Sequence, residues 1–232
     1  PPRARNVRTP MAPGAVARRA AILRGHDGGS GVIGRRRSEM DGPRVSLRSL
    51  RDSDFEAWRS VRSANREWLE PWEPLPEFGT PDALADRSGF RARCQAWDRQ
   101  RQFDAAYGYG VFLGDALIGE VSLGSVQRGP FQSAYVGYWM AEEHAGQGYT
   151  PEAVVLVLRF GFEHLALHRI EAAIVPRNAA SRRVAEKLGM RDEGTSRELL
   201  QIRGVFEDHV RYAMLTQEWT ERKADLEAEF LT

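Results

Sequence analysis

The chain has 232 residues, 42% hydrophobic and 28% charged, the profile of an ordinary globular protein rather than a fibrous or low-complexity one. A net charge of +1 gives no global signal for nucleic-acid binding, and no apolar stretch approaches the roughly twenty residues of a membrane span. Cys94 is the only cysteine, which excludes an internal disulfide and suits the reducing cytoplasm, where we expect the protein to work.

Positive charge is concentrated at the N-terminus. Residues 1–37 contain nine arginines and one acid, Asp27, a net +8 that leaves −7 for the rest of the chain. Prolines and a Gly-Gly-Ser-Gly run accompany the arginines, which predicts a basic, flexible extension over 1–40 before one domain over 41–232. Arginines interrupt its apolar pieces, unlike a secretory signal. Contact with ribosomal RNA and a merely solvated extension remain alternative roles.

The first half of the domain predicts helices between strands. Residues 44–50 alternate as a strand, and Asp52-Ser53 supplies N-cap residue types for a helix. Prolines break "EWLEPWEP" at 67–74, which predicts a short helix and a loop. Thr80-Pro81-Asp82 predicts the start of a helix that runs to about Gln102.

The second half begins with strands. Alternating apolar residues predict a hairpin over 107–113 and 117–123 and a strand over 133–140. A glycine loop follows, and then a helix over about 149–165, a buried strand over 168–175, a helix over 178–189, a hairpin over 191–202 and 204–215, and a charged terminal helix. This order predicts an α/β (α+β) fold: a mixed, mostly antiparallel twisted sheet of about seven strands. Its centre is a right-handed parallel strand–helix–strand unit with flanking helices.

The loop in "EEHAGQGYTPEA" at 142–153 lies at the mouth of the predicted helix. Unpaired N–H groups at a helix N-terminus favour an anion, and Gly146 and Gly148 allow close approach to the backbone. A tight turn that needs positive φ is the alternative. The loop lacks the lysine of a P-loop, and Pro151 replaces the third glycine of a dinucleotide fingerprint, which leaves a pyrophosphate site without magnesium chemistry.

Gly146-Gln147-Gly148 after a strand, followed by Glu152-Ala153, resembles the acetyl-CoA signature of the Gcn5-related N-acetyltransferase (GNAT) superfamily. "HRIEAAIVPRNAASRRVAEKLGM" at 168–190 is similar to its second block. "GPFQSAYVGYWM", "EWLEPWEP" and "RGVFEDHV" resemble the RimJ/RimL branch, which acetylates ribosomal-protein N-termini. The resemblance covers about 43–218. Glu143 and Pro151 depart from the pattern, and Pro151 removes one N–H donor from the phosphate site.

The resemblance implies acetyl-CoA as cofactor and a GNAT fold. Parallel strands that part after residues 140 and 175 would form a slot for the pantetheine arm. Asn178 and Ser181 would lie beside the cofactor, with the Ser181 hydroxyl near sulfur; helix capping is the alternative role for Ser181. The expected cofactor contacts are Tyr138, Trp139, Met140, Ala145, Gly146, Gln147, Gly148, Tyr149, Thr150, Asn178 and Ser181.

Glu198 is the predicted catalytic base, because the RimL-like position falls on Leu200 and Glu198 lies two residues away along the predicted strand. An exposed carboxylate paired with Arg197 or Arg203 is the alternative, and Glu120 is a second candidate base. The predicted acceptor contacts are Trp68, Trp72 and Tyr107, with core packing as the alternative for the tryptophans.

No metal site is expected. His164 and His168 have i, i+4 spacing, but a helix end falls between them and no third ligand is evident. The resemblance implies an acetyl-CoA-dependent N-acetyltransferase that acts on the N-terminus of a protein, in particular a ribosomal protein. Two alternatives remain: acetylation of a small amine, such as an aminoglycoside or polyamine, and a non-catalytic CoA-binding regulatory protein.

Overall fold

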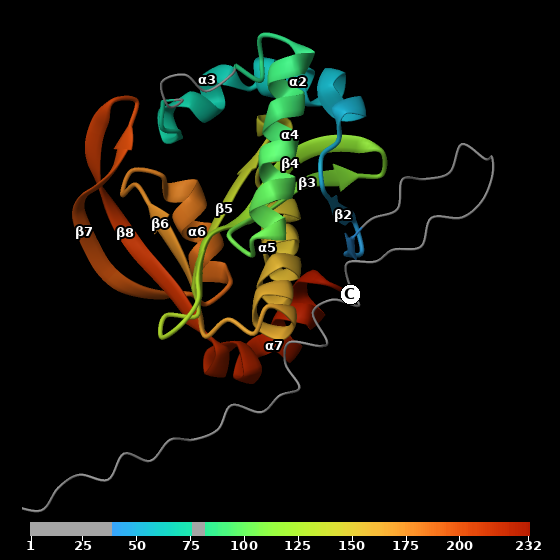
Figure 1. Cartoon of the computed structure of the whole chain (residues 1–232). Helices are drawn as coiled ribbons and strands as arrows, with labels where there is room; N and C mark the ends of the chain where they lie inside the picture. Colours follow the sequence, from blue (N-terminus) through green and yellow to red (C-terminus); the bar gives the residue numbers. More distant parts are fainter. Residues whose placement is uncertain (1–38, 76–81) are drawn as a thin grey trace, which may run out of the picture. The chain divides into compact units, whose positions relative to one another are not determined.

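The structure, a computed structural model, describes residues 39–75 and 82–232. The chain divides into two units, residues 1–36 and 37–232, and every described residue belongs to the second. The predicted N-terminal extension and its RNA contact thus lie outside the described residues, apart from the short stretch from Glu39. Figure 1 shows the arrangement of the helices and strands.

The strands are β1 (Met40–Asp41), β2 (Val45–Arg48), β3 (Tyr107–Leu113), β4 (Ala116–Gln127), β5 (Ser133–Met140), β6 (Arg169–Ile174), β7 (Arg191–Ile202) and β8 (Val205–Leu215). The helices are η1 (Asp52–Asp54), α2 (Phe55–Ala64), α3 (Arg66–Leu69), η2 (Glu70–Trp72), α4 (Arg87–Gln102), η3 (Glu142–His144), α5 (Tyr149–Arg159), η4 (Phe160–His164), α6 (Ala179–Lys187) and α7 (Thr216–Phe230).

All eight strands form one sheet in the order β1-β2-β3-β4-β5-β6-β8-β7. Neighbouring strands run antiparallel except β5 and β6, which are parallel because α5 connects them. This confirms the predicted mixed, mostly antiparallel sheet with one central strand–helix–strand unit. The eighth strand is β1, a two-residue piece that pairs with β2.

Helices cover the two faces of the sheet with separate apolar clusters. On one face α5 is buried without interruption from Pro151 to Leu158, and it packs on apolar residues of β2 to β6. On the other face α2 and α4 enclose a smaller cluster around Trp58 and Phe90. Figure 1 accordingly shows α4 and α5 on opposite sides of the strands.

Two helix boundaries differ from the prediction. Helix α4 begins at Arg87 because the Asp86 side chain caps it by accepting a hydrogen bond from the Gly89 N–H (2.8 Å). The predicted start at Thr80-Pro81 lies outside the described residues. The helix after the glycine loop ends as α-helix at Arg159 and continues as a π-helical turn over η4. Within the described residues no helix is long and apolar enough to cross a membrane.

Candidate active site

A fork in the sheet forms the centre of the candidate site. Only three residue pairs join β5 to β6, and the last of them is Tyr135 with Glu171. Beyond this pair the strands continue without pairing, to Met140 and Ile174. The slot therefore opens inside the strands, earlier than the sequence analysis placed it.

The backbone of β5 offers hydrogen-bonding groups to this slot. The N–H of Ala141 donates to the Ile118 carbonyl on β4 (2.9 Å). Because alternate residues of an antiparallel strand direct their N–H and C=O groups to opposite sides, Tyr138 and Met140 direct theirs toward β6 and Trp139 toward β4. The structure thus separates Trp139 from the other two predicted backbone contacts. The Met140 carbonyl accepts a hydrogen bond from Trp68 Nε1 (3.1 Å).

The glycine loop lies at the N-terminus of α5, as predicted. Gly146 and Gly148 have φ values of 76° and 85°, and Gly148 is the N-cap residue. Glycine adopts such left-handed conformations at low energetic cost because it has no Cβ atom. A side chain at Gly146 would meet open space, so the loop presents bare backbone to its surroundings.

The N–H groups of the loop are available to a ligand. From Gly146 to Thr150 none of them donates a hydrogen bond to any described residue, and the first helical turn closes only at Glu152 N–H to the Gly148 carbonyl (3.2 Å). Such groups, together with the helix dipole, favour an anion. Pro151 supplies no N–H at the third helical position, so the donor set ends at Thr150.

A buried carboxylate holds this loop against β2, a feature that the sequence analysis missed. Glu152 is fully buried and accepts hydrogen bonds from the N–H groups of Arg44 and Val45 (2.8 and 2.9 Å) and from Arg44 Nε (2.8 Å). The guanidinium also donates to the Gln147 carbonyl (3.0 Å) and lies 4.9 Å from the centre of the Tyr149 ring. Arg44 and Glu152 therefore fix the loop from the side of β2.

Asn178 and Ser181 face the slot from the start of α6. The Asn178 side chain caps the helix by accepting from the Ser181 N–H (3.1 Å), so the capping role belongs to Asn178. The Ser181 hydroxyl donates to the Tyr138 phenol (3.0 Å), and that phenol donates to the Ser181 carbonyl (3.1 Å). Burial raises the pKa of Tyr138 to about 12, which keeps the phenol protonated at neutral pH.

The two predicted acceptor tryptophans lie at the open ends of the forked strands. Trp68 bonds the last residue of β5, and the Arg177 guanidinium, from the loop after β6, lies 5.2 Å from the centre of the Trp72 ring. Arg177 also donates to the Pro71 carbonyl (3.1 Å) and pairs with Glu207 on β8. The segment of α3 and η2 therefore spans the mouth of the slot.

Tyr107 and Glu120 are not brought to that mouth. Tyr107 is buried with its ring against Phe160, which follows α5 at the end away from the glycine loop. Glu120 is buried between α2 and α4, where its oxygens accept from Trp58 Nε1 (2.5 Å) and Arg93 Nη2 (2.5 Å). Both Glu120 oxygens are thus already engaged.

Glu198 lies on an irregular part of β7, the outermost strand. The pairing with β8 shifts between Ser196 and Leu200, and Glu198 has a φ of 47° within this bulge. The alternation that related Glu198 to Leu200 is therefore broken. The side chain is exposed, and its N–H donates to Asp208 Oδ1 (2.8 Å). A catalytic role for Glu198 stays a prediction.

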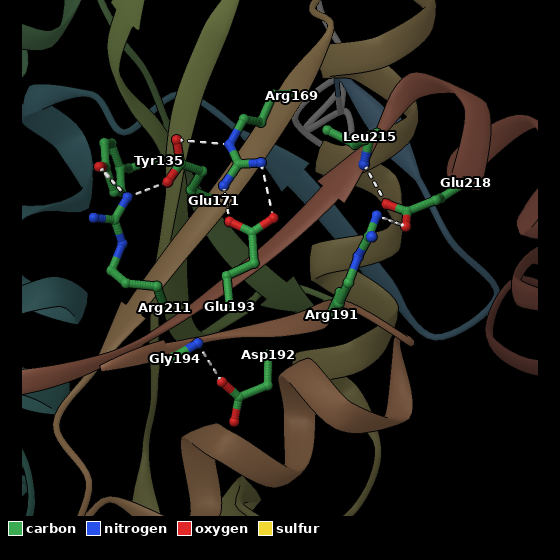
Figure 2. A network of polar contacts seen from close by, with 10 residues as sticks. All are labelled: Tyr135, Arg169, Glu171, Arg191, Asp192, Glu193, Gly194, Arg211, Leu215 and Glu218. Carbon is green, nitrogen blue, oxygen red and sulfur yellow. Dashed lines mark hydrogen bonds and ion pairs between the residues drawn. The ribbon is translucent and has the colours of Figure 1, made fainter. Parts of the chain in front are cut away.

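A charged network lies on the sheet at the base of the fork (Figure 2). Arg211 of β8 donates to Tyr135 Oη (2.7 Å) and to the buried carboxylate of Glu171. Arg169 pairs with Glu171 (3.0 Å) and with Glu193 of β7. These contacts join four strands where the parallel pairing ends. The described residues contain no group of three or more side chains suited to a metal ion.

The comparisons with known proteins agree with this geometry. Residues 44–191 match the acetyltransferase (GNAT) domain family. The probable N-acetyltransferase YjcK of Bacillus subtilis is 37% identical over 178 residues, which cover 76% of this chain and 96% of that protein. The ribosomal protein uS5-alanine N-acetyltransferase of Escherichia coli is 32% identical over 181 residues, which cover 76% of this chain and 90% of that protein.

A solved structure gives the same result. Mycobacterium smegmatis RimJ in complex with CoA-disulfide superimposes with a TM-score of 0.74 at 29% identity and covers 80% of this chain and 88% of that one. The resemblance drawn from the sequence motifs is thus confirmed. The chain belongs to the acetyltransferase (GNAT) family, a family of N-acetyltransferase enzymes.

Proposed function

We propose that this protein transfers the acetyl group of acetyl-CoA to the N-terminal α-amine of a protein, in particular a ribosomal protein. The observation that carries this proposal is the fork between β5 and β6, with Trp68 and Trp72 across its mouth. On one side of the fork, the N–H groups from Gly146 to Thr150 have no partner among the described residues. One relative is named for acetylating alanine of ribosomal protein uS5, and the M. smegmatis RimJ structure contains a CoA-disulfide.

The residues of the site fit acetyl-CoA. The N–H groups from Gly146 to Thr150 suit a pyrophosphate, and the bare backbone at Gly146 permits its close approach. The slot-facing backbone of Tyr138 and Met140 suits the amides of a pantetheine arm, which would pair like an additional strand. Asn178 and Ser181 border the same slot from α6.

Acetyl-CoA supplies a thioester whose carbonyl carbon is open to attack by an amine. The protein's contribution is to bind, orient and exclude water. An α-amine has a pKa of about 8, so roughly a tenth is neutral at pH 7 and a moderate base suffices. The indoles at the slot mouth reduce water there, which favours the neutral amine and strengthens hydrogen bonds to developing charge.

The nature of the acceptor is the finer part of the proposal. A protein N-terminus would enter as an extended chain, and η2 and the β7–β8 hairpin would border its path to the strand ends. Here the Arg203 N–H at the hairpin turn donates to the Glu73 carbonyl (3.3 Å). Action on nascent or assembled ribosomal proteins in the cytoplasm, aided by the arginine-rich residues 1–37, completes the proposal.

A thiol-release assay with acetyl-CoA tests this function. The purified protein is offered peptides that begin with alanine or serine, matched peptides with a blocked N-terminus, and polyamines or aminoglycosides. Release that requires a free peptide N-terminus supports the proposal. Thiol release only with small amines would show that a small amine, and not a protein N-terminus, is the acceptor. Binding of CoA without thiol release under any condition would indicate a regulatory protein.

A further inference from the structure

The general base is the part of the proposed reaction that Glu198 and Glu120 leave open. Glu198 is exposed on the edge strand, and Glu120 has both oxygens occupied between α2 and α4. A base must reach the amine at the slot mouth and must carry a free lone pair. We infer that His209 on β8 is the general base of the acetyl transfer, an inference that rests on the proposed function.

His209 has the geometry of an oriented neutral imidazole. The side chain is 2% exposed, and its Nδ1 lies 2.9 Å from the Glu207 carbonyl oxygen. A carbonyl oxygen only accepts, so Nδ1 carries the hydrogen and donates it. In the neutral ring this leaves the lone pair on Nε2, which has no hydrogen-bond partner among the described residues.

The fold places His209 at the open end of β6. Val210 pairs with Ile174, the last residue of β6, so His209 lies one residue beyond that strand's end. Val210 and Tyr212 pack in the core on the side of α5, so by alternation His209 faces the opposite side of the sheet. This is the side of Arg211 and Tyr135, which are hydrogen-bonded there.

The neighbours of His209 connect it to the slot mouth. Glu207, whose carbonyl orients the ring, pairs through its carboxylate with Arg177, and Arg177 holds Pro71 and lies over Trp72. The imidazole therefore lies on the same side as the tryptophan segment, beside the residues that lead into Asn178. The sequence alone does not point to His209, because a single histidine between strand residues carries no spacing signal.

The charged groups around His209 are already partnered. On its own strand Glu207 pairs with Arg177, and Arg211 pairs with Glu171 of β6. Ser196 is the residue opposite His209 on β7, and the neighbouring Asp208 accepts from the Glu198 N–H. From η2, Glu70 pairs with Arg203 (3.6 Å). Among these groups, His209 Nε2 combines burial with a lone pair that has no hydrogen-bond partner in the described residues.

The proton balance needs no further reactant. His209 Nε2 takes one proton from the α-ammonium group of the acceptor, which leaves a neutral amine. The amine nitrogen forms the new bond to the acetyl carbon, and the bond from that carbon to sulfur breaks. The second amine proton passes to the departing sulfur, so that the products are the N-acetylated peptide and the CoA thiol, and His209 returns its proton to solvent.

The decisive variant is His209→Asn. The Asn amide nitrogen can still donate to the Glu207 carbonyl, while the acceptor at Nε2 is removed. Turnover of an alanine-starting peptide should fall about 10²-fold, the low end for general-base catalysis. The rising limb of kcat/KM against pH should move up toward the titration of the amine itself. The matched control, His168→Asn at an exposed histidine, should retain wild-type turnover.

A second acceptor separates proton removal from mere structural damage. A peptide that begins with an aminooxy group is uncharged across pH 6 to 9, so it needs no base before attack. His209→Asn should acetylate this peptide within about threefold of wild type, because only the ammonium substrate depends on the 10²-fold contribution of a base. Equal losses on both acceptors, in a variant that still binds acetyl-CoA, would overturn the inference.

Two further results keep this test apart from the proposed function. If wild-type protein acetylates no peptide, the proposed function fails first. If wild type is active but His209→Asn does not fold, NMR titration of His209 in the wild-type protein decides: its midpoint must coincide with the rising limb of kcat/KM. A mismatch, or full activity of a folded variant, would contradict the role of His209, and Glu198→Gln would then be the next variant to assay.

Discussion

Gly148 has a left-handed backbone conformation, and the Arg44 side chain lies close to it. Its φ is 85°, and a Cβ atom there would lie 3.1 Å from Nη2 of Arg44. Gly148→Val therefore strains the backbone and displaces the guanidinium that holds Gln147. We expect acetyl-CoA to bind at least tenfold more weakly, by calorimetry, because the N–H groups of the loop lose their alignment.

The control for this prediction is Gly124→Val in β4. A Cβ atom at Gly124 meets nothing within 4 Å, and its φ is not in the left-handed range. Affinity and melting temperature should stay near wild type. Unchanged affinity in a folded Gly148→Val protein would show that the loop is only a turn.

Glu152 is the residue on which the loop's attachment to β2 depends. Its carboxylate is fully buried and accepts three hydrogen bonds, two from backbone N–H groups and one from the charged guanidinium of Arg44. Glu152→Gln places a buried N–H group against the Arg44 Nε–H donor and removes the ion pair, so the free energy of unfolding should drop by about 2 kcal/mol. Urea unfolding measures this, and exposed Glu143→Gln, which should change little, is the comparison.

The network of Figure 2 predicts that the stability of the fold depends on pH. The hydrogen bond from Arg169 lowers the pKa of Glu193 below its ordinary value. Since the unfolded chain then binds this proton more readily, the contribution to stability is present above the usual glutamate range and is lost as pH falls through the lowered pKa. Glu193→Gln should melt about 2 °C lower at pH 7, because the pair is partly exposed.

The same comparison at low pH is the check. The difference between wild type and Glu193→Gln should shrink as pH falls below the usual glutamate range, and it should vanish at the acidic pH where the carboxyl group is protonated in both the folded and the unfolded state. A difference in melting temperature that persists unchanged at that pH would show that packing, and not the ion pair with Arg169, accounts for it.

The predictability of the elements followed the range of the interactions that define them. Alternation and helical spacing are local, so strands β2 to β8 and the terminal helix were predicted within a few residues, while the two-residue β1 was not predicted. The bulge at Glu198 and the attachment of Glu152 to Arg44 depend on residues distant in the chain. A single sequence does not reveal such pairs, and for the same reason it gives no signal for His209.

The glycine loop could be predicted from the sequence for a related reason. The positive φ values at residues 146 and 148 favour glycine, so the two glycines in the sequence already indicate this backbone conformation. The proposed acceptor side depends on where α3 and η2 lie over the strand ends, and long-range contacts such as Trp68 to Met140 determine that position. Tyr107, at the other end of α5, shows that residue type alone does not locate a pocket.

The buried residues of the two apolar clusters all come from Val45 onward in the chain. Residues 1–38 are rich in arginine and proline and offer little to bury. A chain that starts at Glu39 should therefore keep its melting temperature within about 3 °C and its affinity for acetyl-CoA. A drop of ten degrees in calorimetry would mean that the N-terminal residues contribute to the fold.

The short ladder of three residue pairs between β5 and β6 affects how cooperatively the sheet unfolds. Strands β1 to β5 and strands β6, β8 and β7 are each extensively paired, while Ser133 to Tyr135 provides the whole ladder between them. Each block can then open on its own in amide hydrogen exchange. A pantetheine arm paired along the slot would couple the two blocks, so that saturating CoA should merge their separate opening free energies into one.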